Sequence, residues 1–165
     1  MTELAPIVQE SRLSDEQWPA VAAAGDVAVT AGAGTGKTRT LVARYLSLLS
    51  AGLSPREVVA ITFTKKAARE MRNRVRQEVS AYLGKEETLS PDELARWRDV
   101  HDALDAARIG TIHSLCGEIL RRHPAEAGLD PRFEMLDEGQ MALIQAQAVE
   151  EALVWAADDG DTAGS

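Results

Sequence analysis

The residue types that hold a nucleotide phosphate occur together in one stretch, Ala31-Gly32-Ala33-Gly34-Thr35-Gly36-Lys37-Thr38. An apolar run at residues 27–30 precedes this stretch, and a helical pattern begins near Gly36. Between a strand and a helix, the backbone N–H groups of such a loop point inward and the helix N-terminus adds partial positive charge. Lys37 would reach the outer phosphates, and the Thr38 hydroxyl would bind Mg²⁺. The alternative is a glycine-rich turn before an ordinary helix, but the intact Gly-Lys-Thr and its flanks favour a phosphate site.

Gln17 lies upstream of this loop and has two interpretations. The sequence from Ser14 to Gln17 has the pattern of a helix capping box, in which Gln17 would complete the first turn of a short helix. As a nucleotide contact, the side-chain amide would instead offer a donor and an acceptor, which suits the edge of an adenine. The spacing alone favours the cap.

Short strands alternating with helices would position these residues. The run at residues 58–63 is apolar and β-branched, which is typical of a strand buried on both faces of a parallel sheet. The expected strands are residues 27–30, 58–63 and 108–112, and the expected helices are residues 36–50, 65–83, 91–107, 113–122 and 138–156, after an extended lead-in at residues 1–12. This order predicts an α/β fold with a parallel sheet flanked by helices, whose ligands bind at the carboxyl ends of the strands.

Candidate nucleic-acid contacts follow the second and third strands. Phe63 is either a core aromatic or a platform that stacks a base, which is worth roughly 1–3 kcal/mol per base. His113 is either structural or a phosphate contact, and the spacing alone favours structural roles for both residues. Polar residues flank them at Thr62, Thr64 and Thr111.

The helix expected at residues 65–83 has two stripes at helical spacing. The apolar stripe is Ala68, Met71, Val75 and Val79, and the basic stripe is Lys65, Arg69, Arg72 and Arg76. A basic stripe taken alone is usually a solvated face. The alternative is a track for the phosphate backbone of nucleic acid, which would attract the polymer without reading its sequence.

The charge is distributed unevenly along the 165 residues, whose net charge is −8. Residues 125–165 hold ten acidic side chains and one basic side chain, whereas residues 65–76 hold six Lys or Arg and one Glu. A single cysteine, Cys116, excludes an internal disulfide. No run is long enough to span a membrane, and the N-terminus lacks the pattern of a secretory signal, so we expect a cytoplasmic protein with no membrane partner.

Several motifs follow one another in an order that resembles superfamily 1 DNA helicases of the UvrD/Rep type. Residues 13–17 resemble the Q motif, residues 31–38 the Walker A motif with its leading Ala, residues 61–71 motif Ia, and residues 110–116 and 130–138 the next two blocks. Ile112 replaces an aromatic residue that is usual in UvrD and Rep. The form Thr-Ile-His-Ser is more similar to the AddA/RecB branch of helicase–nucleases, whose nuclease part has no counterpart in this chain.

The resemblance implies a P-loop NTPase of RecA-like fold that uses ATP and Mg²⁺ to move on single-stranded DNA. It assigns ATP binding to Gln17, Ala31, Gly32, Ala33, Gly34, Thr35, Gly36, Lys37, Thr38 and Arg39, with Thr38 on the metal. Together with the basic stripe, it assigns single-stranded-DNA contact to Thr62, Phe63, Thr64, Lys65, Arg69, Thr111 and His113. Lys65 stands where the family often has Asn and adds a positive charge.

No complete catalytic set is evident in the sequence. Such motors need a Walker B Asp-Glu pair and arginine fingers from a second RecA-like domain. The run at residues 133–138 ends in Asp-Glu, but Glu134 interrupts its apolar pattern and the resemblance places this block elsewhere. We therefore expect the N-terminal portion of a larger helicase, partnered by the remainder of that helicase or by a partner subunit. Its expected parts are a partial ATP-binding domain at residues 1–123, a helical start of an accessory subdomain at residues 124–156, and a disordered acidic tail at residues 157–165.

Two alternatives remain open at the level of sequence. A stand-alone P-loop GTPase would need an Asn-Lys-x-Asp motif, and the only asparagine, Asn73, has other neighbours. A small kinase would need an Arg-rich lid, whereas the arginines here lie on a regular amphipathic pattern. A truncated, non-catalytic interaction module is the other alternative, against which the intact phosphate loop argues.

Overall fold

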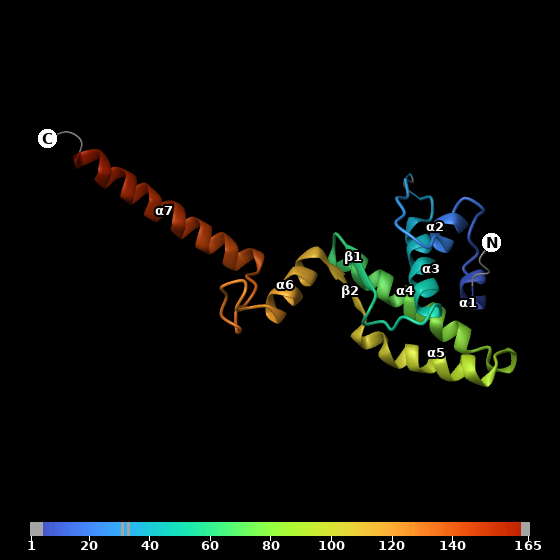
Figure 1. Ribbon diagram of the computed structural model, residues 1–165. Coiled ribbons are helices and arrows are strands. Elements are labelled where there is room, and N and C mark those ends of the chain that lie inside the picture. Colours follow the sequence, from blue (N-terminus) through green and yellow to red (C-terminus); the bar gives the residue numbers. More distant parts are fainter. Residues whose placement is uncertain (1–4, 31, 33, 163–165) are drawn as a thin grey trace. The chain divides into compact units, whose positions relative to one another are not determined.

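The computed structural model describes residues 5–30, 32 and 34–162. The chain divides into two compact units, Met1–Cys116 and Gly117–Ser165. This division falls within helix α6 (Ile112–Arg122), whereas the expected domain boundary follows residue 123. The first unit contains the phosphate loop and both strands (Figure 1).

The described part of the first unit has one parallel sheet of two strands, β1 (Val59–Thr62) and β2 (Arg108–Thr111). Val59 pairs with Arg108 and Thr62 with Thr111, so the carboxyl ends of the strands meet at one edge. The connection consists of α4 (Lys65–Leu83), the 3-10 turn η1 (Glu86–Thr88), α5 (Pro91–Ala103) and the 3-10 turn η2 (Leu104–Ala106). The predicted α/β organisation with parallel strands is confirmed for these elements.

The predicted first strand, residues 27–30, is wrong for this structure, because these residues are not in a strand. A strand needs a neighbour for its backbone N–H and C=O groups, and the sheet among the described residues contains only β1 and β2. Val27 and Val29 are 48% and 53% exposed. The prediction that the second strand is buried on both faces is also wrong, since Val59 and Ile61 of β1 are exposed while Ala60 is buried.

Helix α4 is the centre of the packed core. It contacts both strands, α1 (Pro6–Gln9), α3 (Lys37–Ser50) and α5. Its predicted apolar stripe is confirmed, because Ala68, Met71, Val75 and Val79 are all buried. Tyr82 packs edge-on against Trp97 of α5, with ring centroids 5.7 Å apart. The helical period of the sequence therefore identified the face that holds the unit together.

The residues before the phosphate loop differ from the prediction. The lead-in predicted as extended contains α1, which starts with Pro6 in its first turn and buries Ile7 and Val8 in the core. Proline favours this position because its missing N–H would be unpaired there in any residue. The helix predicted to begin after Ser14 is a turn at residues 15–17 followed by α2 (Trp18–Ala22).

The second unit contains the end of α6, a loop and the helix α7 (Glu138–Thr162). Phe133 of the loop lies under the Arg121 guanidinium, 5.4 Å from its central carbon to the ring centroid. Helix α7 continues past the predicted end at residue 156, so the expected disordered tail is helical at residues 157–162, and residues 163–165 lie outside the described residues. No helix in the described part of the chain is both long and apolar enough to cross a membrane.

Candidate nucleotide and nucleic-acid sites

The phosphate loop enters α3 through two glycines in the left-handed region of backbone conformation. Gly34 has φ 79° and Gly36, the N-cap residue of α3, has φ 84°. An L-residue pays about 1–2 kcal/mol in this region, which explains glycine at both positions. Ala31 and Ala33, both predicted ATP-binding residues, lie outside the described residues.

Hydrogen bonds within the loop gather its side chains around one carbonyl. The Thr35 hydroxyl donates to the Gly32 carbonyl oxygen at 2.8 Å, and the Lys37 ammonium donates to the same oxygen. Lys37 and Thr38 form the exposed first turn of α3. The loop therefore has an ammonium and two hydroxyls at the N-terminus of a 14-residue helix, a set of groups that fits a nucleotide phosphate with Mg²⁺.

Gln17 joins the loop through its side-chain amide. Its Nε2 donates to the Thr35 carbonyl oxygen at 3.0 Å, and its Oε1 accepts a hydrogen bond from the Ser14 backbone N–H at 3.1 Å. A Cβ atom added to Gly36 would lie 2.7 Å from Gln17 Nε2, so the amide fills the space that a side chain would need. The cap interaction is present, but it closes a turn before α2, and the same side chain also reaches the phosphate loop.

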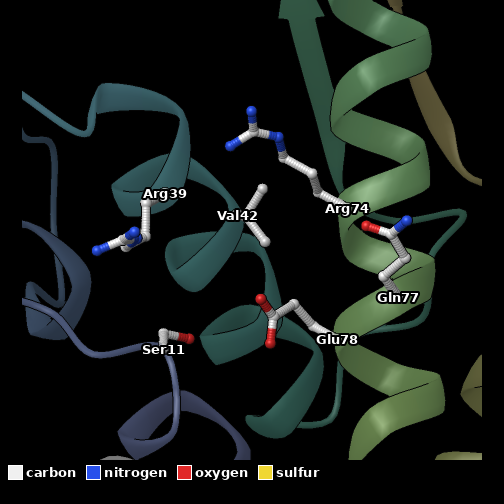
Figure 2. A pocket seen from close by; sticks show the side chains of 6 residues that line it. All are labelled: Ser11, Arg39, Val42, Arg74, Gln77 and Glu78. Atoms are coloured by element: carbon white, nitrogen blue, oxygen red, sulfur yellow. The ribbon is translucent and has the colours of Figure 1, made fainter. Parts of the chain in front are cut away.

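Lys37 and Arg39 line different cavities. Lys37 lines a cavity of about 460 Å³ whose other walls include the exposed Val27, Val29 and Leu41. Arg39 is two residues further along α3, about 200° around the helix at 100° per residue. It lines a second cavity of about 390 Å³ together with residues of α4 (Figure 2). The structure thus does not bring Arg39 into the cavity of Lys37, and its contact with ATP stays a prediction.

The carboxyl end of β1 presents an exposed aromatic ring. Phe63 is 99% exposed, so its interpretation as a core residue is wrong. Thr64 caps α4, because its hydroxyl accepts a hydrogen bond from the Ala67 backbone N–H at 3.1 Å. The Thr62 hydroxyl donates to the Thr64 carbonyl oxygen at 3.0 Å, which ties the backbone on both sides of the ring. A ring held in this way at a sheet edge has a free face on which a base could stack.

The basic stripe of α4 divides into two parts with different roles. Arg72 donates to the Ile109 carbonyl oxygen of β2 at 2.7 Å, and Arg76 pairs with Asp105 at 2.6 Å, so both hold α4 in place. Lys65 and Arg69 are exposed and line a cavity of about 240 Å³ at the carboxyl end of β2. These two side chains are the part of the stripe that remains able to meet a ligand.

Thr111 and His113, the predicted contacts at the end of the third expected strand, differ in exposure. Thr111 is buried, lines the same cavity as Lys65, and its hydroxyl lies 2.9 Å from the Ser114 hydroxyl and accepts from the Ser114 N–H at 3.3 Å. His113 is exposed, and its side chain makes no hydrogen bond or ion pair with the described residues. The structure therefore brings Thr111 together with the basic residues of α4 but leaves His113 outside that cavity.

Sequence reasoning missed the cavity that Arg39 lines. Its other polar residues are Ser11, Arg74, Gln77 and Glu78. Arg74, Gln77 and Glu78 have helical spacing, which was visible in the sequence. Nothing in the sequence connected them with Ser11, because the shared cavity depends on how the segment after α1 packs beside α3 and α4.

Comparison with known proteins finds matches to helicases. The family model described as the UvrD/REP helicase N-terminal domain matches residues 13–162. An ATP-dependent helicase/nuclease subunit from Anoxybacillus flavithermus is 38% identical over 149 residues, which cover 88% of this chain and 12% of that protein. Proteins of the same name are 37% identical in Listeria monocytogenes, over 90% of this chain, and 40% identical in Pelotomaculum thermopropionicum, over 87%. The chain spans 11–12% of the length of these curated relatives.

Proposed function

This chain belongs to the UvrD/REP helicase N-terminal domain family, and we propose that it is the ATP-binding and single-stranded-DNA-contacting portion of an ATP-dependent DNA helicase. The observation that carries this proposal is the connection between Gln17 and the phosphate loop through the Thr35 carbonyl, 3.0 Å from Gln17 Nε2. It joins a residue able to recognise an adenine edge with a loop able to hold phosphates.

The nucleotide part of the proposal assigns a role to each group of the phosphate loop. Lys37 and the loop N–H groups bind the phosphates, and the Thr38 hydroxyl is a ligand of Mg²⁺. Bound Mg²⁺ neutralises negative charge on the phosphates. In the free protein Lys37 donates to the Gly32 carbonyl oxygen, and Gln17 uses its amide on Ser14 and Thr35. Nucleotide binding would exchange such internal hydrogen bonds for bonds to the ligand.

The DNA part of the proposal uses the carboxyl edge of the sheet. Phe63 supplies an exposed ring for base stacking at the end of β1, and Lys65 and Arg69 supply positive charge around the cavity at the end of β2. Stacking and phosphate contacts of this kind bind a single strand without reading its sequence. Thr62, Thr64 and Thr111 hold the local backbone through their hydroxyls.

The remainder of a longer helicase is the proposed partner of the first unit. Apolar side chains of residues 27–30 and of the outer face of β1 are exposed, among them Val29 at 53% and Ile61 at 44%. Covering such side chains contributes about 25 cal/mol per Å² of apolar area. The groups that activate water and the arginine fingers would come from that remainder, so we propose that this chain alone binds ATP without efficient turnover.

The double variant Lys65→Gln/Arg69→Gln tests the DNA part. We expect weaker binding to a labelled single-stranded oligonucleotide. Each phosphate contact releases counterions from the DNA, and this release favours binding, so losing a contact lowers the affinity. The slope of log K against log salt concentration should decrease by about 0.7 per lost contact. Fluorescence anisotropy titrations at several salt concentrations measure both quantities.

The control is Arg56→Gln/Arg98→Gln, which removes the same charge from exposed positions that do not line this cavity. The affinity of this control for the oligonucleotide should fall only because the net charge of the protein changes. The slope of log K against log salt concentration should therefore change less than in Lys65→Gln/Arg69→Gln. Equal slopes for the two double variants would contradict the assignment of Lys65 and Arg69 to the DNA site.

A further inference from the structure

Arg44 of α3 joins its helix to the short helix α2. Its Nη1 donates to the Val21 carbonyl oxygen at 2.8 Å and also to the Ala23 carbonyl oxygen. Val21 lies near the end of α2 and Ala23 is the C-cap residue, where carbonyl groups have no partner within the helix. The half-buried guanidinium supplies those partners, and its positive charge suits the C-terminus of a helix.

Helix α2 depends on such contacts for its position. It has five residues, which are too few for a helix that is stable by itself. Val21 is fully buried, Trp18 packs against the core, and α2 lies beside α3 (Figure 1). Apolar packing has little directional preference, whereas a hydrogen bond depends on both distance and angle. The two bonds from Arg44 therefore restrict how far along α3 this helix lies.

Gln17 lies at the opposite end of α2 from these bonds. It is the N-cap residue of α2, and its Nε2 donates to the Thr35 carbonyl oxygen of the phosphate loop at 3.0 Å. Five helical residues span only about 7.5 Å, at 1.5 Å per residue, so a shift at one end of α2 moves the other end. Without Arg44, α2 could shift and draw Gln17 away from the loop.

Helix α3 carries both Lys37 and Arg44 on nearly the same side. Arg44 follows Lys37 by about two helical turns, and both residues line the cavity of about 460 Å³. Lys37 is the proposed phosphate contact at the start of this helix. The same helix thus provides the phosphate-binding ammonium and the side chain that sets the place of Gln17.

We propose that Arg44 is a positioning residue for nucleotide recognition, which holds α2 so that the Gln17 amide lies against the phosphate loop. This inference rests on the proposed ATP site, at which Gln17 recognises the base. Arg44 acts through Gln17 and does not itself contact the nucleotide. It therefore affects selectivity for the base, whereas Lys37 and the loop N–H groups bind the phosphates without it.

The first test needs no nucleotide. The side-chain amide NMR signals of Gln17 in the free chain report its hydrogen bond to Thr35. In Arg44→Gln these signals should move toward those of a solvent-exposed glutamine amide. Signals that stay as in the wild type would overturn the proposal, whether or not the chain binds ATP.

Arg96→Gln is the matched control. The Arg96 guanidinium also donates to two backbone carbonyls, those of Leu49 and Ser50 at the end of α3. The control removes the same charge and the same kind of hydrogen bonds, but at the opposite end of α3 from the phosphate loop. It should leave the Gln17 signals unchanged, and equal changes in both variants would overturn the proposal. Urea unfolding confirms that both variants fold and compares their stability.

The second test separates the base from the phosphates. Wild type and Arg44→Gln are titrated with ATP, GTP and tripolyphosphate, each with Mg²⁺. Arg44→Gln should lose about three- to tenfold in affinity for ATP, which is the size expected for one hydrogen bond. The ratio of ATP to GTP affinity should fall toward one, and the affinity for tripolyphosphate should change little. An equal loss for tripolyphosphate would mean that Arg44 contacts phosphate directly, and would contradict a positioning role.

A double variant shows whether Arg44 acts through Gln17. In a Gln17→Ala background, Arg44→Gln should cause little further loss of ATP affinity, because both changes remove the same contact. Losses that add in full would refute the proposal. A wild-type chain that does not distinguish ATP from GTP would count against the proposed adenine site instead, while the Gln17 amide signals still decide the role of Arg44.

Discussion

Lys37→Ala lowers the affinity for Mg²⁺-ATP by about 10- to 100-fold. A hydrogen bond to a charged group contributes about 1.5–3 kcal/mol, and 1.4 kcal/mol corresponds to a factor of ten. Lys37 is exposed at the start of α3, and the Gly32 carbonyl keeps the Thr35 hydroxyl as a donor after the substitution. The fold should therefore be preserved, with a helical circular dichroism spectrum like that of the wild type. Isothermal titration with Mg²⁺-ATP measures the loss.

Lys66→Ala is the matched control for this substitution. Lys66 is also exposed in the first turn of a helix, α4, but it does not line the cavity of Lys37. Its affinity for Mg²⁺-ATP should stay within about twofold of the wild type. If both lysine variants bound ATP as tightly as the wild type, the phosphate loop would not be the nucleotide site.

Gly36→Ala should destabilise the loop and weaken nucleotide binding together. An alanine in the left-handed region costs about 1–2 kcal/mol, and Gly36 has φ 84°. The new Cβ would lie 2.7 Å from Gln17 Nε2, so the amide must leave the Thr35 carbonyl. We expect a lower free energy of unfolding in urea and a clear loss of ATP affinity.

Gly34→Ala separates the effect of backbone strain from the effect of displacing the Gln17 amide. Gly34 has φ 79°, but a Cβ there would meet nothing within 4 Å, so this variant carries the backbone strain without displacing Gln17. Gly36→Ala should therefore be the more damaging of the two. In a Gln17→Ala background the difference between the two glycine variants should shrink, and a difference that persisted would show that the contact with Gln17 is unimportant.

Most of the helices and two of the three expected strands could be predicted from local sequence, whereas the state of residues 27–30 could not. Helix α4 has the predicted bounds, residues 65–83, because its apolar stripe and its Thr64 cap are both local signals. Residues 27–30 look like a strand in isolation, but a strand exists only where another strand supplies hydrogen-bond partners. Pairing depends on distant sequence, which explains why the prediction failed at this point.

The candidate sites show the same division between local and distant information. The glycines of the phosphate loop and the position of Lys37 follow from a contiguous motif. The bond from Gln17 to Thr35 spans 18 positions, and the bond from Arg72 to Ile109 spans 37. Sequence spacing could place Lys65, Arg69, Arg72 and Arg76 on one stripe, but only the fold distinguishes the two exposed residues from the two that hold α4 against its neighbours.

The most direct test of the proposed nucleotide site is an equilibrium titration of the isolated 165-residue chain with ATP and, separately, with GTP, both with Mg²⁺. We expect saturable binding of ATP at one site, with weaker binding of GTP because the Gln17 amide matches the adenine edge. ATP that does not bind saturably, or ATP and GTP that bind with equal affinity, would contradict the proposal that Gln17 and the phosphate loop form one adenine-nucleotide site.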